Sequence, residues 1–376
     1  MAALDFQFDE GAVHFPALGL WLDAHRPIGP DETVFVSHAH SDHTAAHARV
    51  ILSPPTRSLM RARIGGERVE RVLEFGQRVP AVDLGIRLPD GHLTLLPAGH
   101  ILGSAMLLLE GDGTSLLYTG DFKLRPGLSA EACEPRHAEI LVMETTFGRP
   151  QYAFPATAEI VAGVVRFCRE ALDNDETPVL LGYSLGKSQE ILTALVGAGL
   201  PIALSDPVAK LTAVYESLGR TFPTYETLNF KTAAGKVVLA PPGMAVANLR
   251  RKLGPSRVAV LTGWAVDPGC RYQYQADAAF PLSDHADFPD LVEFVRRVAP
   301  RQVYTLHGFA ADFAGHLRTL GFQAQALSQS EQLELMLGAS PAPVSTGRGT
   351  ANLRNAPAVL AGGSEDLAPT FRAFAS

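Results

Sequence analysis

The stretch His38-Ala39-His40-Ser41-Asp42-His43 places three imidazoles and one carboxylate within six residues. The segment before it, residues 33–37 (TVFVS), is apolar and β-branched and predicts a buried strand. If His38 and His40 extend this strand, their side chains point to the same side, because alternate residues of a strand share a face. The last two residues of the motif then fall where the chain turns toward residues 44–50, which we expect to be helical. A loop that is rich in histidine by chance is a poor explanation, since the chain has only 12 histidines among 376 residues.

This motif has the chemistry of a metal site. Neutral imidazoles and carboxylates are ligands that suit zinc, and the motif contains no competing cysteine. Its spacing allows two metal ions to lie side by side, one held by His38 and His40 and the other by Asp42 and His43. A catalytic metal needs more ligands than one loop supplies, so further ligands are expected downstream.

Two later segments end in residues that suit this site. Residues 95–100 (LLPAGH) and 115–121 (SLLYTGD) are apolar runs, and each ends in a glycine followed by His100 or Asp121. Glycine lets the backbone turn sharply, so that the terminal side chain can face the same cavity. A single histidine or aspartate after a strand is usually a turn residue. The order and context of the two together indicate metal ligands.

The order of these residues resembles the signature of the metallo-β-lactamase superfamily, which is HxHxDH followed by a later histidine and then an aspartate. The resemblance implies two metal ions roughly 3.5–4 Å apart that share a hydroxide. It assigns one ion to His38, His40, His100 and Asp121, and the other to Asp42, His43 and the shared Asp121. It also matches Asp23, at the end of residues 20–23 (LWLD), to an early aspartate that orients the site and is not counted as a direct ligand.

Three further segments narrow the resemblance to the β-CASP branch, the nucleases with a metallo-β-lactamase fold. Motifs A, B and C of that branch match Glu144 in VMETTFG, His285 in SDHAD and His307 in YTLHG. By this resemblance His307 completes the ligands of the second metal, and His285, held by Glu144, donates a proton to the leaving oxygen. A carboxylate partner orients an imidazole and favours its charged form. A structural ion pair between two domains is the alternative role for Glu144 and His285.

The hydrophobic pattern divides the chain into two kinds of structure. Short β-type segments separated by Gly and Pro dominate residues 1–148, and from about Pro155 helices alternate with strands. This alternation predicts a parallel α/β sheet with crossover helices. Because His285 and His307 rejoin the metal site, we expect the α/β segment to be an insertion into the first domain. The expected helices are 156–172, 187–196, 208–218 and 243–253, and the expected strands are 178–183, 202–205, 236–239 and 258–261.

The expected fold class is therefore α/β. By the resemblance, residues 1–148 and 272–337 form a metallo-β-lactamase domain, an αββα sandwich of two sheets between helices. Residues 149–271 form the inserted β-CASP domain. From about Ala339 the chain is rich in Ala, Pro, Ser and Gly, so residues 338–376 are expected to form a flexible linker or tail. A tether to a further module, such as a ligase, and a plain disordered tail are both compatible with this composition.

The composition agrees with a soluble enzyme of the cytoplasm. With 47% hydrophobic and 19% charged residues, the chain can bury one large or two moderate cores. Residues 1–10 have no apolar h-region, and no apolar run reaches the roughly 18 residues that span a bilayer, so we expect neither a signal peptide nor membrane association. The cysteines are too few and too scattered for a disulfide framework, which favours a reducing compartment; they are Cys133, Cys168 and Cys270.

The net charge of −7 argues against a broad electrostatic grip on nucleic acid. Basic residues nevertheless gather in two runs, at 61–78 and at 250–257. Each run is compatible with a solvated helix face or with a track for phosphates. An acidic chain with local basic patches fits binding at a defined strand end better than the coating of long duplex.

Residues 182–188 (GYSLGKS) join an expected strand to an expected helix start, where free backbone N–H groups favour phosphate. The glycine spacing does not match a P-loop. Ser184 and Lys187 are candidate phosphate contacts, and an ordinary turn with an exposed lysine is the alternative. Arg271 is a candidate to line the same cleft, whereas Trp264 fits a core position better than a base-stacking platform.

Within the β-CASP branch, the chain is most similar in character to bacterial DNA ligase-associated exonucleases, relatives of Artemis and the crosslink-repair nucleases. This resemblance implies DNA as the favoured nucleic-acid partner, hydrolysed from 5′ to 3′ with single strands preferred, in DNA repair and in association with a DNA ligase. DNA-specific eukaryotic members tend to lack the motif C histidine, so His307 leaves DNA versus RNA open. The segments that carry the likeness are 97–105 (PAGHILGSA), 119–123, 183–190 and 282–288 (LSDHADF).

The implied cofactors are two divalent metal ions, zinc in the first place and manganese as the alternative. In the expected mechanism Asp42 belongs to the catalytic group around an activated water, and His285 protonates the departing 3′ oxygen with the help of Glu144. An RNA-processing β-CASP ribonuclease and a small-molecule metallohydrolase of the same fold remain alternatives. The second would not require Glu144, His285 and His307. A catalytically silent nucleic-acid scaffold would have lost metal ligands, and none is missing here.

Overall fold

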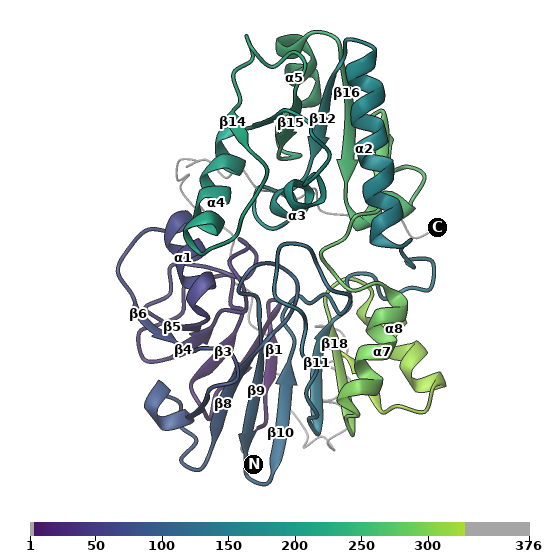
Figure 1. Ribbon diagram of the computed structural model, residues 1–376. Helices are drawn as coiled ribbons and strands as arrows, with labels where there is room; N and C mark the ends of the chain where they lie inside the picture. The colour runs from purple at the N-terminus through teal and green to yellow at the C-terminus, as the bar shows by residue number, and fades with distance from the viewer. Residues whose placement is uncertain (1–3, 328–376) are drawn as a thin grey trace, which may run out of the picture.

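The computed structural model describes residues 4–327, which form a mixed α/β structure with three β-sheets. Figure 1 shows the third sheet, with its helices, above the other two. The expected α/β class is confirmed at this level. The predicted linker at 338–376 lies outside the described residues. No helix among residues 4–327 has the length and apolar character that would let it cross a membrane.

The first two sheets pack face to face around a shared hydrophobic core. In the second sheet, Leu107 and Leu109 face this core, whereas the alternate residues Met106 and Leu108 face away from it. This period of two explains why residues 105–109 are all apolar, since both faces are covered. The first sheet contains β1 (Gln7–Asp9), β2 (Ala12–Phe15), β3 (Leu20–Leu22), β4 (Thr33–Phe35), β5 (Arg49–Leu52) and β6 (Val69–Val72). The second has the order β19 (Ala324–Ala326), β18 (Gln302–Leu306), β11 (Ile140–Glu144), β10 (Thr114–Tyr118), β9 (Ala105–Gly111), β8 (His92–Pro97) and β7 (Arg78–Pro80).

Helices cover the outer faces of both sheets (Figure 1). The second sheet packs against α7 (Phe288–Val298) and α8 (Ala310–Thr319), through residues such as Phe294 and Phe313. The first sheet packs against α1 (Pro54–Arg63), through Leu59 and Met60, and against α4 (Asp206–Ser217). A short 3₁₀ helix, η1 (Ala81–Leu84), follows β7. Strand β18 pairs in parallel with β11, so a segment late in the chain completes a sheet that begins early.

The third sheet is entirely parallel and matches the predicted alternation closely. All four predicted helices and all four predicted strands of this region are confirmed, with boundaries that differ by a few residues. Strands β14 and β17 were not predicted. The sheet order is β14 (Tyr225–Thr227), β13 (Ile202–Leu204), β15 (Val237–Ala240), β12 (Thr177–Leu181), β16 (Ser256–Leu261) and β17 (Ala278–Phe280). The helices are α2 (Thr157–Asp173), α3 (Lys187–Ala194), α4 and α5 (Val246–Leu253), followed by η2 (Gly263–Val266) and α6 (Cys270–Gln273).

Two local predictions around the histidine motif are wrong. Strand β4 ends at Phe35, so His38 and His40 lie in an irregular loop and do not extend the strand. Residues 44–48 are not helical, and β5 begins at Arg49. The reason is tertiary: the loop is fixed by contacts with distant residues, such as the hydrogen bond from the Ser37 N–H to Asp23, and these outweigh local propensity.

Candidate metal centre

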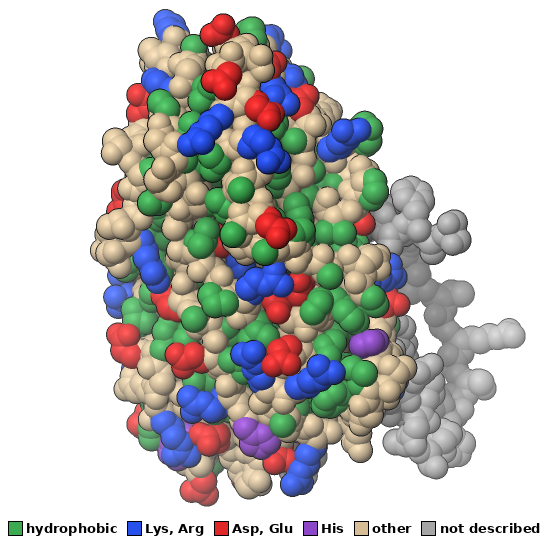
Figure 2. All heavy atoms as spheres, turned by 45° about the vertical axis from the view of Figure 1, so that its right-hand side comes forward, with side chains coloured by type: hydrophobic (Ala, Val, Ile, Leu, Met, Phe, Trp, Pro, Cys, Tyr) green, Lys and Arg blue, Asp and Glu red, His purple; other side chains and the backbone are tan. Residues whose placement is uncertain are grey.

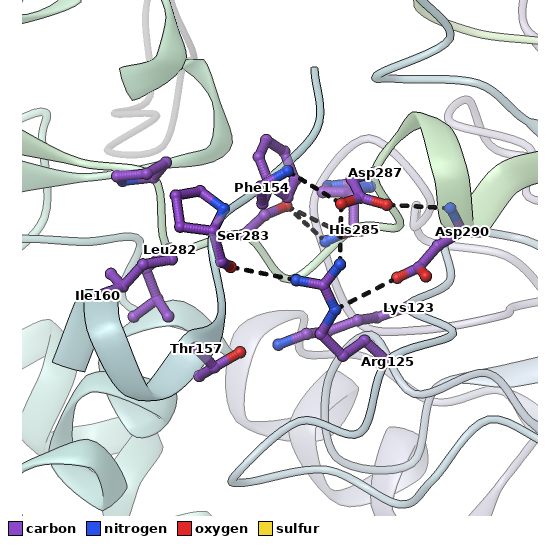
Figure 3. A pocket seen from close by; sticks show the side chains of 12 residues that line it. Lys123, Arg125, Phe154, Thr157, Ile160, Leu282, Ser283, His285, Asp287 and Asp290 are labelled. Carbon is purple, nitrogen blue, oxygen red and sulfur yellow. Dashed lines mark hydrogen bonds and ion pairs between the residues drawn. The ribbon is translucent and has the colours of Figure 1, made fainter. Parts of the chain in front are cut away.

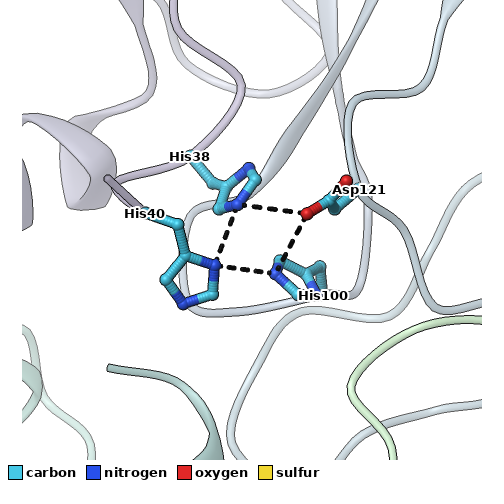
Figure 4. A group of neighbouring side chains, drawn as sticks. All are labelled: His38, His40, His100 and Asp121. Carbon is cyan, nitrogen blue, oxygen red and sulfur yellow. Dashed lines mark hydrogen bonds and ion pairs between the residues drawn. The ribbon is translucent and has the colours of Figure 1, made fainter. Parts of the chain in front are cut away.

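Four of the predicted ligands converge at the ends of three different strands (Figure 4). His38 and His40 come from the loop after β4, His100 from the loop after β8, and Asp121 from the loop after β10. Their donor atoms lie within 4.8 Å of one another. The Nδ1 atom of His40 is 3.0 Å from Nε2 of His38 and 3.1 Å from Nε2 of His100. The Oδ2 atom of Asp121 is 3.5 Å from Nε2 of His38 and 3.8 Å from Nε2 of His100.

This donor set fits a divalent metal ion. Ligands about 2.0–2.1 Å from a tetrahedral zinc ion lie roughly 3.3 Å apart, close to the spacing of the four donors here. Burial and the nearby imidazole of His285 lower the pKa of His100 to about 3. Burial, followed by His43 and His100, lowers the pKa of His38 well below its ordinary value. Both imidazoles are therefore held in the neutral form, which is the form that binds metals.

Asp23 lies beneath the loop and holds it in place. Its Oδ2 accepts hydrogen bonds from the Ser37 hydroxyl at 2.6 Å and the Tyr118 hydroxyl at 2.9 Å, and is 3.0 Å from Nδ1 of His43. The bond to Nδ1 leaves Nε2 of His43 free to face the donor cluster. Asp23 adopts a positive φ of 52°, an uncommon conformation for a residue other than glycine, of the kind found at functional sites. This contact pattern fits the orienting role proposed for it.

Sequence reasoning missed the two hydroxyl groups that complete this arrangement. Ser37 bonds to Asp23 and is also 2.9 Å from Nδ1 of His38, so it links the aspartate to a candidate ligand. Tyr118 is fully buried at the end of β10, three residues before Asp121. A buried tyrosine beside a run of site residues needs a partner for its hydroxyl, and that was the available signal.

The second predicted set is gathered more loosely. Nε2 of His43 lies 3.3 Å from Oδ2 of Asp121, the same oxygen that faces the first set, and 3.9 Å from Oδ2 of Asp42. The ring centres of His43 and His307 are 6.0 Å apart. Among residues 4–327, none of the groups of three or more donors within 4.8 Å contains Asp42, His43 or His307. The structure thus brings these residues to one side of Asp121 without the close spacing of the first set.

The predicted pair of Glu144 and His285 forms beside the first set. Nδ1 of His285 is 3.0 Å from Oε1 of Glu144, and its ring centre is 4.6 Å from that of His100. The other oxygen of Glu144 accepts the Thr146 N–H at 2.7 Å, so this buried carboxylate is fixed on both sides. Burial alone would lower the pKa of His285, but Glu144 and Asp121 outweigh it and raise the pKa to about 9. At neutral pH this imidazole therefore carries a proton that it can donate.

The three candidate substrate contacts lie in different surroundings. Ser184 is buried, and the Lys187 ammonium is buried in contact with Asp284 at 2.9 Å. Arg271 is exposed on α6 and stacks on the ring of Tyr272, with its guanidinium carbon 4.6 Å from the ring centre. The segment that carries Ser184 and Lys187 nevertheless reaches the site, since Nε2 of His40 is 3.1 Å from the Leu185 carbonyl oxygen.

A pocket opens beside His285 (Figure 3). It encloses about 290 Å³, part of which is open to solvent. Arg125 crosses it, donating hydrogen bonds to Asp287 at 2.9 Å and to the Pro155 carbonyl at 3.2 Å. Lys123, Thr157 and Ser283 contribute further polar groups, and Phe154, Ile160 and Leu282 contribute apolar surface. A mixed lining of this kind suits a ligand that has both charged and apolar parts.

Several residues of the two basic runs pair with acidic neighbours. Arg61 donates two hydrogen bonds to Glu70, Arg78 one to Glu110, and Arg250 one to Asp277. On the face shown in Figure 2, basic and acidic side chains are interspersed. This face therefore presents no track of a single sign of charge. Trp264, half-buried, packs with Phe147 and Tyr152, as expected for a core position.

The turn after His307 gives a testable prediction. Gly308 has a φ of +55°, and an added Cβ would lie 2.4 Å from the Cα of Thr146. We expect Gly308→Ala to destabilise the protein by about 1–3 kcal/mol, because it combines left-handed backbone strain with a clash against backbone. Denaturant unfolding measures this. Gly197→Ala is the control, since Gly197 has a φ of +78° but open space around it; an equal loss in both variants would contradict the close-packing argument.

Comparisons with known proteins find relatives that are named as nucleases or as a DNA ligase. The chain is 50% identical over 352 residues to a protein of Opitutus terrae named "Probable DNA ligase", and the match covers 93% of this chain and 34% of that protein. It is 28% identical over 317 residues to the 5′ exonuclease Apollo of Gallus gallus, with 80% of this chain and 64% of that protein covered. It is 22% identical over 343 residues to an RNase J-like protein of Methanocaldococcus jannaschii, with 74% and 81% covered. The chain thus spans about a third of the first relative and less than two thirds of the second.

A solved structure shares the fold. It is a protein of unknown function from Enterococcus faecalis, with a TM-score of 0.53 and 15% sequence identity over 75% of this chain and 76% of that chain. No family model matches the chain. The structure contains a cluster of histidine and aspartate side chains that could hold a metal ion. The chain is also similar to Apollo and to an RNase J-like protein. By these similarities the chain resembles the β-CASP branch of the metallo-β-lactamase-fold nucleases.

Proposed function

We propose that this protein is a metal-dependent nuclease that hydrolyses phosphodiester bonds. The observation that carries the proposal is the position of His285, an imidazole with a raised pKa. It lies directly beside the cluster of three histidines and Asp121 that could hold a metal ion. A proton donor next to a metal centre is what the cleavage of a phosphodiester requires, since the leaving oxygen must be protonated. The similarity to Apollo and to an RNase J-like protein supports the same chemistry.

We further propose the domain organisation expected from the sequence. Residues 1–148 and 272–337, of which 1–3 and 328–337 lie outside the described residues, would form an αββα sandwich, supported by the two facing sheets and by α1, α7 and α8 on their outer faces. Residues 149–271 would form the inserted β-CASP domain, supported by the separate parallel sheet. Strand β17 (Ala278–Phe280) pairs with β16 of that sheet. One strand of this sheet therefore lies beyond residue 271, the expected end of the inserted domain. The site would then lie where the two domains meet.

The proposed centre holds two divalent ions, zinc or manganese. His38, His40, His100 and Asp121 would hold one, and Asp42, His43, His307 and the shared Asp121 the other. Bound ions would acidify a water molecule and stabilise charge on phosphate oxygens. The chain's own contribution is positional and acid–base: Asp23 fixes the His43 ring through Nδ1, and Glu144 fixes His285. His285, protonated at neutral pH, gives its proton to the departing 3′ oxygen, and Glu144 stabilises the charged imidazole before that transfer.

The finer proposal is a 5′-to-3′ exonuclease of single-stranded DNA that acts in DNA repair. The pocket beside His285, with its mixed polar and apolar lining, offers contacts for one end of a strand near the proton donor. The acidic net charge and the interspersed surface charges do not favour the coating of long duplex. The relative named Apollo is called a 5′ exonuclease, which supports the polarity. An RNA-processing ribonuclease is the second candidate, supported by the RNase J-like relative and by the presence of His307.

A digestion experiment separates these candidates. End-labelled single-stranded DNA and RNA, each with a 5′-phosphate or a 5′-hydroxyl end, are incubated with the protein and zinc or manganese. We expect the single-stranded DNA to be shortened stepwise from its 5′ end. Excess chelator should stop the reaction. Faster cleavage of RNA would favour the ribonuclease. No cleavage of either polymer, with turnover of a small ester or lactam, would overturn the nuclease proposal.

We also propose a functional association with a DNA ligase. The support is the relative in Opitutus terrae that is named a probable DNA ligase and extends well beyond the region matched here. A nuclease that prepares strand ends and a ligase that joins them act on the same DNA ends in sequence. Co-purification of a ligase with this protein, followed by its loss after nuclease treatment, would show whether DNA mediates the contact.

The pH dependence of cleavage should report the pair of Glu144 and His285. His285 is the acid form below its pKa of about 9, so proton donation is lost as the pH rises through that value. Glu144→Gln removes the carboxylate that raises this pKa, and burial then lowers it. We expect the alkaline limb of the kcat/KM profile to move down by about one pH unit or more. Glu139→Gln is the control, and an unmoved limb in Glu144→Gln would contradict the assignment of His285 as the acid.

A further inference from the structure

Two of the three histidines in the first ligand set are held from behind by backbone carbonyl groups. Nε2 of His40 is 3.1 Å from the carbonyl oxygen of Leu185, and Nδ1 of His100 is 2.9 Å from that of Asp284. A carbonyl oxygen only accepts hydrogen bonds, so each of these ring nitrogens must carry the hydrogen. The opposite nitrogen is then the free donor: Nδ1 in His40 and Nε2 in His100. These are the two atoms that lie 3.1 Å apart in the ligand cluster.

The two carbonyl groups come from segments that are joined by a buried ion pair. The Lys187 ammonium lies 2.9 Å from Oδ1 of Asp284 and donates a hydrogen bond to the Leu282 carbonyl at 2.8 Å. The Lys187 residue is 1% exposed, so its charge has no access to solvent. A buried ammonium needs such partners, because an unpaired charge in the interior is strongly unfavourable. The contact therefore ties the start of α3 to the loop before His285.

The backbone approaches the site closely at the same point. Gly186 lies between Leu185 and Lys187 with a φ of +83°, and an added Cβ would lie 2.2 Å from Cγ2 of Ile101. Ile101 directly follows His100. Residues 185–187, at the start of α3, thus pack tightly against the loop that carries His100. No residue larger than glycine fits at position 186.

We propose that Lys187 and Asp284 are positioning residues for the metal centre: their ion pair fixes the Asp284 and Leu185 carbonyl groups, which set the ring orientation and the free nitrogen of His100 and His40. This inference rests on the metal centre proposed above. It assigns Lys187 a different role from the phosphate contact suggested by its sequence context. Its consequence is that the segment around α3, far in sequence from every ligand, controls how tightly the first metal is held. Partners behind metal ligands typically contribute about 10–100-fold in metal affinity.

Metal affinity, measured on the full chain with zinc alone, tests this role. The variants are Lys187→Met, which removes the ammonium, and the double variant Lys187→Met with Asp284→Leu, which replaces both charges by apolar groups. Breaking one partner of a buried pair destabilises a protein strongly, whereas replacing both is often neutral. The double variant therefore separates the stability of the fold from the positioning of the ligands. Zinc affinity comes from competition with a chromophoric chelator, and Tm of the zinc-free protein reports stability.

Glu190→Gln is the matched control. Glu190 lies on α3 and forms a buried ion pair with Lys123 at 2.9 Å. This pair also joins α3 to the loop after β10, which carries Asp121. Its carboxylate also accepts hydrogen bonds from the N–H groups of Leu128 and Ser129. No hydrogen bond of this carboxylate in the described structure goes to a candidate ligand. Its loss should lower Tm without a specific effect on zinc affinity.

We expect zinc affinity at the first metal site to fall by about 10-fold or more in both Lys187→Met and the double variant, although Tm recovers in the double variant. If zinc affinity recovers together with Tm, the ion pair is only structural and the inference is wrong. An equal loss of affinity in Glu190→Gln would also overturn it. In either of these cases the unchanged protein would still bind zinc and cleave DNA, so the proposed function would stand. A parent chain that binds no zinc would instead refute the metal centre itself.

Discussion

Replacing Asp42 by alanine should lower kcat/KM for phosphodiester cleavage by about 1,000-fold, because metal ions supply several kcal/mol of charge stabilisation and each 1.36 kcal/mol is a factor of ten. The same change should leave the free energy of unfolding within about 0.5 kcal/mol, since substitutions at exposed positions rarely do more. The Asp42 side chain is 78% exposed, and its Oδ2 lies 3.9 Å from Nε2 of His43. A carboxylate that is this exposed contributes little to the free energy of unfolding.

The measurement pairs cleavage kinetics with denaturant unfolding of the same preparation. Asp31→Ala is a suitable control, because Asp31 is also exposed and lies outside the donor cluster. Adding His43→Ala to Asp42→Ala should abolish cleavage while the protein stays soluble, since Nε2 of His43 faces Asp121 at 3.3 Å. Full activity in the Asp42 variant would remove this residue from the metal centre.

Replacing His285 by alanine should lower kcat for DNA cleavage by about 100- to 10,000-fold, the usual contribution of a general acid. The ring lies between Glu144 and His100 and is 20% exposed, so a substrate can reach it from the pocket side. The loss should depend on the leaving group. The nitrophenolate group of a nitrophenyl phosphodiester is a good leaving group that departs without a proton. Cleavage of this substrate should therefore fall far less than cleavage of DNA.

This contrast distinguishes proton donation from a structural ion pair between domains. A structural role would lower both activities in proportion to the loss of folded protein, whereas a proton donor affects only the poor leaving group. His137→Ala serves as the control, because His137 is exposed and contacts the Val298 carbonyl instead of the site. Equal losses with both substrates would contradict the assignment of His285 as the acid.

The regular elements of residues 157–261 could be predicted from the sequence because their signal is local. Helix α2 (Thr157–Asp173) shows an apolar face at helical spacing, with Ile160, Val164 and Phe167 buried, and β12 is an apolar run on both faces. The candidate ligands could also be identified, since histidine and aspartate at strand ends are chemically distinctive. The structure brings His38, His40, His100 and Asp121 together as expected, by a loop and not by an extended strand.

What the sequence could not reveal depends on contacts between distant segments. The helix expected at 44–50 is absent because the loop is held by Asp23 and its partners, which lie elsewhere in the chain. Lys187 follows a glycine-rich turn and therefore suggests an exposed phosphate contact, yet it is buried against Asp284, almost a hundred residues later. The Leu185 and Asp284 carbonyl groups leave no trace in side-chain chemistry at all, because every residue has a carbonyl.

The claim that seven side chains from His38 to His307 surround a pair of metal ions is tested most directly by metal stoichiometry. The protein is saturated with zinc, freed of excess metal by gel filtration, and analysed for zinc per chain. We predict two zinc ions in the unchanged protein and one in His307→Ala. A maximum of one zinc ion in the unchanged protein would contradict the paired-ion centre, and two zinc ions in the His307 variant would contradict the assignment of His307 as a ligand.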